Sequence, residues 1–318
     1  MITFADVRAA EQAIEPYLLR TPTVPSPGLT DLLGASVTLK LEQLQRTGSF
    51  KARGATTKLL SLTEQERAAG VVAVSGGNHG IAVAVMADLL DITATVVMPR
   101  TAPASSIARA DAAGATVRLT EDMPTAFAEA DRLRAAGMTV VHPFDDPVVI
   151  AGQGTVGLEL AEDDQELTDV LVSVGGGGLI AGIAVAVREL IPAARIWGVE
   201  TEGARTMADA LAAGRPVPTA LSSIVTTLSA PEVSALTYEH AAHLVHDIVT
   251  VSDAAAVDGS LRMADHGGVW AEPADGSVLP AAEQIVDQLG TDLRLGLVLA
   301  GSNTTTAEVL HWSQHLAP

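Results

Sequence analysis

Residues 168–187 read TDVLVSVGGGGLIAGIAVAV, an apolar run that is interrupted by four consecutive glycines. A membrane-spanning helix needs about 20 apolar residues, and the stretch from Val170 to Val187 barely reaches that length. Each glycine inside an isolated helix also costs about 1 kcal/mol relative to alanine. The stretch is therefore predicted to form a strand, a glycine loop and a helix rather than a membrane span.

The same alternation continues on both sides of this stretch. GVVAVS (70–75) precedes HGIAVAVMADLL (79–90), and ATVVMP (94–99) precedes SSIARADAAGA (105–115). Short β-branched runs that alternate with helical segments predict βαβ units and a parallel sheet. We expect an α/β fold, with a seam in the middle of the chain at PFDDP (143–147).

Composition excludes several classes of protein. The 318 residues are enough for two lobes, each with its own core. The absence of cysteine excludes disulfide scaffolds, thiolate metal sites and cysteine nucleophiles. The net charge of −19, from 19 basic and 38 acidic residues, opposes binding to nucleic acid or to an anionic membrane. With no signal-peptide pattern at the N-terminus, we expect a cytoplasmic protein.

Four glycines, Gly175, Gly176, Gly177 and Gly178, lie between the predicted strand and helix. Their backbone N–H groups, together with the helix N-terminus, are suited to holding a phosphate. A turn needed only for close packing is the structural alternative. The run also fits a dinucleotide-binding pattern that ends at Ala181, with Glu200 where a ribose-binding acid belongs, so a dehydrogenase is a competing interpretation.

A second candidate loop, SGGNHG (75–80), also follows a strand and precedes a helix. Ser75 and Asn78 offer short polar side chains, and Gly77 lets a small ligand approach the backbone. The alternative is a helix cap by Ser75 or Asn78. His79 taken alone is more typical of a structural hydrogen bond than of catalysis.

The third candidate is Lys51, one of only three lysines, which stands in GSFKARGA (48–55). A lysine among such neighbours is commonly solvated on a helix. A desolvated amine with a lowered pKa, by contrast, is suited to Schiff-base chemistry. A phosphate cradle combined with a partly buried lysine is what pyridoxal phosphate requires of a protein.

Taken together, SFKARGA (49–55), SGGNHG (75–80) and the tetraglycine run resemble the fold type II pyridoxal-phosphate enzymes, and within them the serine/threonine dehydratase and serine racemase family. The resemblance extends through most of the chain, including HPFDD, GVETEGA, WAEPADG and LAGSN. It implies a tryptophan synthase β-like fold of two domains, each a mostly parallel sheet flanked by helices. The large domain is expected to comprise residues 1–66 and 147–318, and the small domain residues 67–146.

The resemblance also implies roles for the candidate residues. Lys51 is expected to hold the cofactor as a Schiff base with Phe50 against it, and Asn78 to bond the phenolic oxygen. Gly175 to Gly178 are expected to hold the phosphate. Ser75, Gly77, Asn78 and His79 are expected to surround the substrate.

Three positions depart from the family pattern. Gly76 replaces a serine that serves as acid and base in the racemases, which favours elimination. Ala300 replaces a serine or cysteine at the ring nitrogen. Ser302, Thr304 or water is left to take that place, although the spacing indicates that neither side chain points the same way. The segment SIVTTL (223–228), where relatives carry Asp-Gly, is the third departure and leaves substrate identity open.

A divalent cation site is a further feature of some family members. Glu200 and Ala204 match its ligand positions, but Thr206 stands where a second carboxylate is needed. The pattern is therefore broken, and no metal ligand set is predicted.

The resulting hypothesis is a pyridoxal-phosphate ammonia-lyase that converts L-threonine or L-serine to a 2-oxoacid and ammonia, and that forms a homodimer by resemblance. The chain ends where the catalytic unit is expected to end, so no feedback domain is expected. A dehydratase for 3-hydroxyaspartate or another β-substituted amino acid, a serine racemase, and a catalytically weak cofactor or amino-acid binder are the alternatives.

Overall fold

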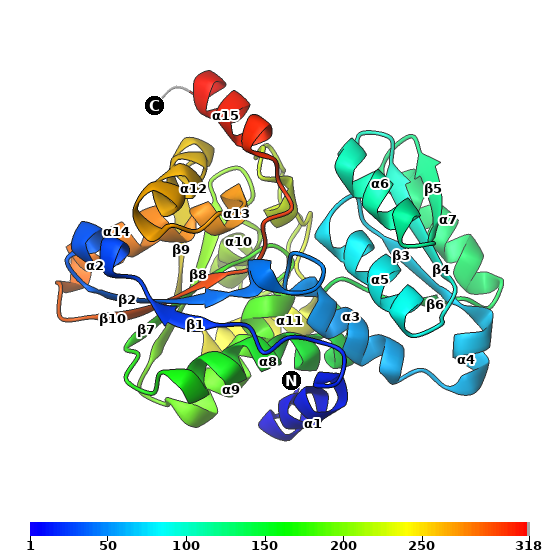
Figure 1. Cartoon of the computed structure of the whole chain (residues 1–318), viewed down its shortest axis with the longest axis horizontal. Helices are drawn as coiled ribbons and strands as arrows, with labels where there is room; N and C mark the ends of the chain where they lie inside the picture. Colours follow the sequence, from blue (N-terminus) through cyan, green and yellow to red (C-terminus); the bar gives the residue numbers. More distant parts are fainter. Residues whose placement is uncertain (317–318) are drawn as a thin grey trace.

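The computed structural model describes residues 1–316 and contains two sheets in two lobes (Figure 1). The six-stranded sheet has the order β1-β2-β10-β7-β8-β9 and is parallel except for the β1–β2 pair. The four-stranded sheet has the order β5-β4-β3-β6 and is parallel throughout. The predicted α/β fold of two mostly parallel sheets flanked by helices is confirmed.

The large lobe contains the six-stranded sheet and the small lobe the four-stranded sheet. Strands of the large lobe are β1 (Thr23–Pro25), β2 (Ser36–Leu41), β7 (Asp169–Ser173), β8 (Arg195–Thr201), β9 (Asp247–Val251) and β10 (Arg294–Leu299). Strands of the small lobe are β3 (Val71–Val74), β4 (Ala94–Pro99), β5 (Thr116–Thr120) and β6 (Thr139–Val140). All four strands of the small lobe come from the range 67–146, but the domain boundaries themselves stay a prediction.

The helices cover both sheets (Figure 1). They are α1 (Phe4–Ile14), α2 (Pro27–Leu33), α3 (Lys51–Leu60), α4 (Glu64–Ala69), α5 (Asn78–Leu89), α6 (Ala104–Ala112), α7 (Met123–Ala135), α8 (Pro147–Asp163), α9 (Gly178–Leu190), α10 (Thr206–Ala213), α11 (Ala235–Leu244), α12 (Asp253–Gly267), α13 (Pro273–Gly276), α14 (Val278–Leu289) and α15 (Thr306–His315). Two short 3-10 helices are η1 (Glu42–Leu44) and η2 (Thr226–Leu228).

Residues 168–187 form β7, a glycine loop and most of α9, as predicted. All five residues of β7 are buried, which explains why its central residues, Val170 to Val172, are all apolar. Helix α9 packs against α8 at close range, since a Cβ on Gly182 would lie 2.4 Å from the Gly154 nitrogen. Glycine is therefore required at this crossing, and the close packing orients the N-terminus of α9.

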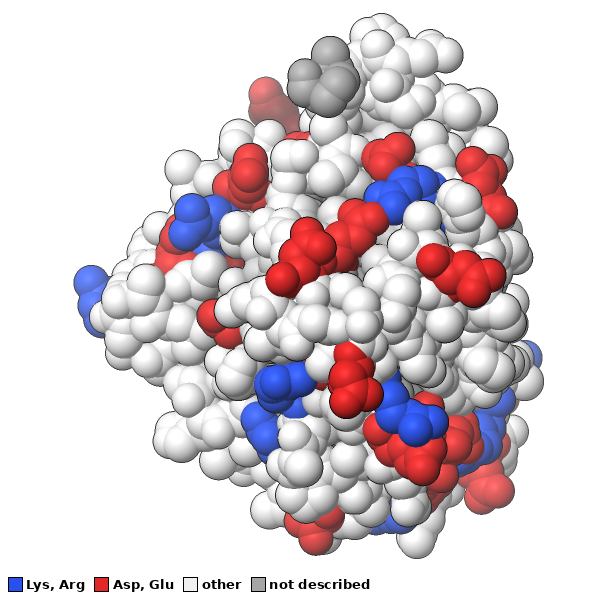
Figure 2. Space-filling view, turned by 90° about the vertical axis from the view of Figure 1, so that its left-hand side faces the viewer, with Lys and Arg blue, Asp and Glu red and all other residues white. Residues whose placement is uncertain are grey.

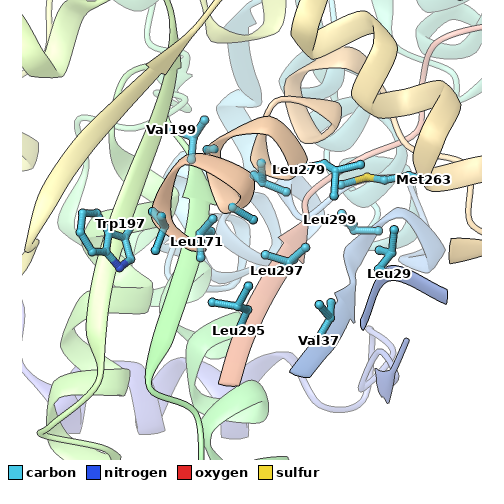
Figure 3. Close-up of a cluster of buried hydrophobic side chains, with 14 of the residues drawn as sticks. Leu29, Val37, Leu171, Trp197, Val199, Met263, Leu279, Leu295, Leu297 and Leu299 are labelled. Carbon is cyan, nitrogen blue, oxygen red and sulfur yellow. The ribbon is translucent and has the colours of Figure 1, made fainter. Parts of the chain in front are cut away.

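The core of the large lobe packs strands β2, β7, β8 and β10 against α2, α12 and α14 (Figure 3). Each buried leucine or valine contributes roughly 1.5–3 kcal/mol relative to an exposed one. The side chains labelled in Figure 3 are Leu29, Val37, Leu171, Trp197, Val199, Met263, Leu279, Leu295, Leu297 and Leu299. This core holds the carboxyl ends of β7 and β10, from which the site is built, in a fixed arrangement.

A buried ion cluster connects α3 to the large sheet. Arg53 bonds Glu42 and Glu159, each at 2.7 Å, and the ammonium of Lys40 lies 2.6 Å from Glu159. Because the two cations and two carboxylates neutralise one another, the cluster can exist without water. Arg53 lies two residues after Lys51, so the cluster fixes the first turn of the helix that carries this lysine.

Acidic and basic side chains are interspersed on the face seen in Figure 2, in agreement with the dispersed charges of the sequence. No helix within residues 1–316 is both long enough and apolar enough to cross a membrane.

Candidate active site

Lys51 is the first residue of α3 and is partly buried. Its Nζ donates a hydrogen bond to the Pro143 carbonyl oxygen at 3.0 Å and lies 4.9 Å from the centre of the Phe50 ring. Burial disfavours the ammonium form and lowers the pKa of Lys51 to about 8, although the nearby Glu272 acts in the opposite direction. Lys51 is therefore not a freely solvated helix lysine, and its amine is readily deprotonated.

The other two lysines are engaged in ion pairs. Lys40 is fully buried against Glu159, and Lys58 lies 2.7 Å from Asp146. Of the three lysines, Lys51 alone combines a lowered pKa near neutrality with a position between the two lobes. It is the lysine best suited to hold a carbonyl compound covalently.

The tetraglycine loop leads from β7 into α9, which begins at Gly178. Within residues 1–316, no protein acceptor is found for the N–H groups of Gly175 to Gly178. A Cβ on Gly176 would lie 2.2 Å from the Phe144 ring, and Gly177 has a φ of 86°, so side chains are excluded from both positions. Free amide donors at a helix N-terminus suit a phosphate group, and the loop therefore fits pyridoxal phosphate.

The loop SGGNHG lies between β3 and α5, on the small lobe. The alternative of a Ser75 or Asn78 helix cap is wrong, because Gly77 occupies the N-cap position and no side chain caps the helix. The Ser75 hydroxyl accepts a hydrogen bond from the Gly77 amide at 3.1 Å. The first turn of α5 is thus left with amide donors that suit a carboxylate.

His79 is buried, and its Nε2 donates to the Val141 carbonyl oxygen at 2.8 Å. Burial and the nearby Lys51 lower the pKa of His79 to about 3, so the ring is neutral. Its side chain therefore has a structural role, and its backbone N–H belongs to the first turn of α5.

Asn78 joins the two lobes. Its Nδ2 donates to both carboxylate oxygens of Glu272, at 2.9 and 3.1 Å, and its Oδ1 accepts from Asn303 at 2.6 Å. Arg109 of α6 extends the network by donating to the Asn303 side chain and to the Thr47 carbonyl. The orientation of Asn78 is thus fixed by partners from the large lobe.

The positions considered for a metal are used for structural contacts. Glu200 is fully buried and accepts hydrogen bonds from the Met207 and Ala208 amides, at 2.7 and 2.9 Å. Burial raises the pKa of Glu200 to about 7. Thr206 donates to the Ala230 carbonyl, and Ala204 is buried. These hydrogen bonds occupy the Glu200 carboxylate, which the competing dinucleotide interpretation placed at a ribose. No cluster of three metal-ligating side chains occurs within residues 1–316.

Ala300 directly follows β10, and its carbonyl oxygen accepts a hydrogen bond from the Phe50 amide at 2.9 Å. Ser302 lies next to this segment, and its amide donates to the Gly48 carbonyl at 3.0 Å. Gly301 donates its amide to Asp275, a fully buried carboxyl group. Asp275 and Glu272 were not predicted as site residues.

Comparison with known proteins identifies the family. The family described as "Pyridoxal-phosphate dependent enzyme" matches residues 14–301, and the chain belongs to it. The cofactor is accordingly pyridoxal phosphate.

Curated relatives and solved structures narrow the class to the fold type II enzymes of the serine/threonine dehydratase and serine racemase group. The chain is 38% identical to the L-threonine ammonia-lyase of Thermotoga maritima, covering 95% of this chain and 76% of that protein. It is 37% identical to a putative threonine dehydratase of Sinorhizobium fredii, covering 95% and 92%. Maize serine racemase superposes with a TM-score of 0.92 at 31% identity, covering 99% of this chain and 98% of that one. The resemblance inferred from the sequence is confirmed.

Proposed function

We propose that this protein is an ammonia-lyase that uses pyridoxal phosphate to convert L-threonine or L-serine to a 2-oxoacid and ammonia. The observation that carries the proposal is the position of Lys51, whose pKa of about 8 is set by burial, between two loops that offer amide donors. The names of the relatives, which include an L-threonine ammonia-lyase, support this substrate class.

The residues have separate tasks in this mechanism. When bound, pyridoxal phosphate supplies the electron sink for the carbanion at the substrate α-carbon. The amides of Gly175 to Gly178 hold the phosphate, and Asn78 contacts the phenolic oxygen. The Ser75 hydroxyl and the amides of the first turn of α5 hold the substrate carboxylate, which fixes the α-hydrogen relative to Lys51.

Proton transfer falls to Lys51. Its neutral Nζ accepts the α-proton, since its pKa of about 8 lets the free amine form near neutral pH. The ammonium so formed on Lys51 returns the proton to the β-hydroxyl, which leaves as water. The resulting enamine is released and hydrolysed to the 2-oxoacid and ammonia. The hydrogen bond from the Phe50 amide to the Ala300 carbonyl oxygen, at 2.9 Å, holds the backbone next to Lys51 in place.

Elimination is favoured over racemisation because of Gly76. A Cβ at this position would lie 2.9 Å from the Cβ of Ala102, so a serine requires that Ala102 shift. Without an acid and base on the opposite face, the α-carbon can be deprotonated and reprotonated from the Lys51 face only.

The test is turnover of L-threonine and L-serine by the purified protein with pyridoxal phosphate, measured as 2-oxoacid and ammonia. We expect 2-oxobutanoate or pyruvate from the wild type and a loss of at least roughly 10²–10⁴-fold in Lys51→Ala. Lys58→Ala is the matched control, because it removes another lysine of α3, one that is paired with Asp146, and this variant should retain activity. Oxaloacetate from 3-hydroxyaspartate, or a D-amino acid as the main product, would support an alternative, and cofactor binding without product would indicate a binder.

A cytoplasmic homodimer with a large domain of residues 1–66 and 147–318 and a small domain of residues 67–146 is also proposed, with the resemblance as support. Cell fractionation and light scattering test the location and the dimer. Limited proteolysis tests the boundaries, because cleavage should concentrate near 66 and 147.

A further inference from the structure

Asp275 is a fully buried carboxyl group for which the mechanism above has no use. It lies in α13, where Oδ2 accepts the Gly301 amide at 2.6 Å and Oδ1 accepts the Ser173 hydroxyl at 3.3 Å. Within residues 1–316, no lysine, arginine or histidine lies within ion-pair distance of it. A buried acid with neutral donors alone and no cation is costly, and it calls for a ligand of complementary charge.

The peptide group between Ala300 and Gly301, directly after β10, lies between Asp275 and the segment that carries Lys51. The Ala300 carbonyl accepts the Phe50 amide, while the Gly301 amide donates to Asp275. These two groups belong to the same trans peptide, in which C=O and N–H point in opposite directions. The lysine segment therefore approaches from one side and the Asp275 carboxyl group from the other.

Asp275 also lies between the two flanks of the site. Its partner Ser173 ends β7, two residues before the tetraglycine loop. Three residues before Asp275 is Glu272, which bonds Asn78. The carboxyl group is thus situated between the phosphate-binding loop and the amide that contacts the phenolic oxygen.

The chemistry of pyridoxal phosphate matches this arrangement. The aldehyde carbon lies between the phosphate-bearing carbon and the phenolic carbon, and the ring nitrogen is at the opposite end of the ring. With the aldehyde at Lys51, the phosphate at Gly175 to Gly178 and the phenolic oxygen at Asn78, the nitrogen faces away from the lysine. The methyl group of Ala300 offers this nitrogen neither a donor nor an acceptor.

We propose that Asp275 is the partner of the ring nitrogen and that its carboxylate accepts a hydrogen bond from the protonated nitrogen of bound pyridoxal phosphate. In the cofactor-free protein, burial and the adjacent Glu272 raise the pKa of Asp275 well above its ordinary range, which favours the protonated form of the carboxyl group. On binding, the carboxyl O–H bond breaks and an N–H bond forms, so that the proton moves to the ring with no net uptake. The protonated ring withdraws electrons more strongly, which assists removal of the α-proton.

This proposal rests on the proposed role of Lys51, and the experiment separates the two. Protein is loaded with pyridoxal phosphate labelled with 15N in the ring, and the 15N resonance is recorded by solid-state NMR between pH 6 and 9. Borohydride reduction followed by peptide mass spectrometry shows in parallel whether the cofactor is attached to Lys51. Failure of attachment contradicts the Lys51 assignment, whereas attachment with a neutral ring nitrogen contradicts the Asp275 assignment alone.

In the wild type we expect the resonance of a protonated pyridine nitrogen at every pH in this range. Asp275→Asn should move it to the neutral position and weaken cofactor binding about tenfold or more, as measured by equilibrium dialysis. Glu272→Gln, which alters the neighbouring acid, should keep the protonated resonance. A neutral ring nitrogen in the wild type would overturn the proposal by itself. A ring nitrogen that stays protonated in Asp275→Asn would also overturn it, as would a nitrogen that becomes neutral in Glu272→Gln but not in Asp275→Asn.

Discussion

Replacing Lys51 by methionine is expected to stabilise the cofactor-free protein at pH 7. Burial lowers the pKa of Lys51 from 10.5 to about 8, which at about 1.4 kcal/mol per tenfold change corresponds to about 3 kcal/mol of destabilisation by the ammonium. The side chain is only partly buried, and it loses its hydrogen bond to Pro143 in the variant. We therefore expect a net gain of roughly 1–2 kcal/mol in the free energy of unfolding.

The sign of the pH dependence follows from linkage. Below about pH 8 Lys51 is protonated in both the folded and the unfolded state, so the penalty is fully present. As the pH rises from about 8 to 10.5, the folded state loses its proton first and the wild type gains relative stability. The difference between the two proteins should therefore shrink through this window.

The assay is urea unfolding of both proteins, without cofactor, at pH 7, 9 and 10.5. Groups remote from Lys51 titrate alike in both proteins and cancel in the difference, and His79, whose pKa is about 3, stays neutral throughout this range. Lys58→Met, which removes a partly buried lysine paired with Asp146 at 2.7 Å, serves as the control and should not stabilise the protein at pH 7. A less stable Lys51→Met at pH 7, or a difference that is the same at pH 7 and 10.5, would refute the reasoning.

Three further outcomes are expected. Gly176→Ala, whose Cβ would lie 2.2 Å from the Phe144 ring, should weaken binding of pyridoxal phosphate at least about tenfold in equilibrium dialysis. Gly214→Ala strains the backbone as well, because Gly214 has a φ of 69°, but it lies after α10 and outside the site and should leave the affinity unchanged. Arg53→Met leaves two buried carboxylates without their guanidinium and should lower the free energy of unfolding by about 3–5 kcal/mol in urea; a loss below about 1 kcal/mol would show that the cluster is not buried as described. The pKa of Glu200 is raised from 4.5 to about 7, so the folded state binds more protons than the unfolded state between these values and the wild type loses stability as the pH rises through them. Glu200→Gln should flatten this part of the stability profile, by up to about 3 kcal/mol, and an unchanged slope would contradict the assignment.

The local sequence predicts the helices and strands, and also the glycine loops of the candidate site. The change from β-branched runs to alanine-rich segments predicts the βαβ units, and a glycine run after an apolar strand predicts the loop of Gly175 to Gly178. Lys51 stood out because lysines are rare in this chain and its neighbours are small and apolar. These signals depend on neighbours in sequence, which is why they are visible without a structure.

The partners of Asn78 and the position of Asp275 depend on long-range contacts. Asn78 and Glu272 are 194 residues apart in the chain and belong to different lobes, so their contact arises only when the two lobes pack together. The segment WAEPADG contained a signal, since its two acids, one just before and one within the short helix that begins at Pro273, stand among apolar residues and glycine. That signal does not specify the partner of either acid, because contacts across lobes leave no periodicity in the sequence.

Attachment of pyridoxal phosphate to Lys51 is tested most directly by borohydride reduction of the protein with bound cofactor. Mass spectrometry of its peptides then shows which lysine carries the reduced cofactor. Since the chain has three lysines, Lys40, Lys51 and Lys58, the assignment is unambiguous. We predict one phosphopyridoxyl group per chain, on Lys51; its presence on Lys40 or Lys58 instead, or its absence from all three, would contradict the account.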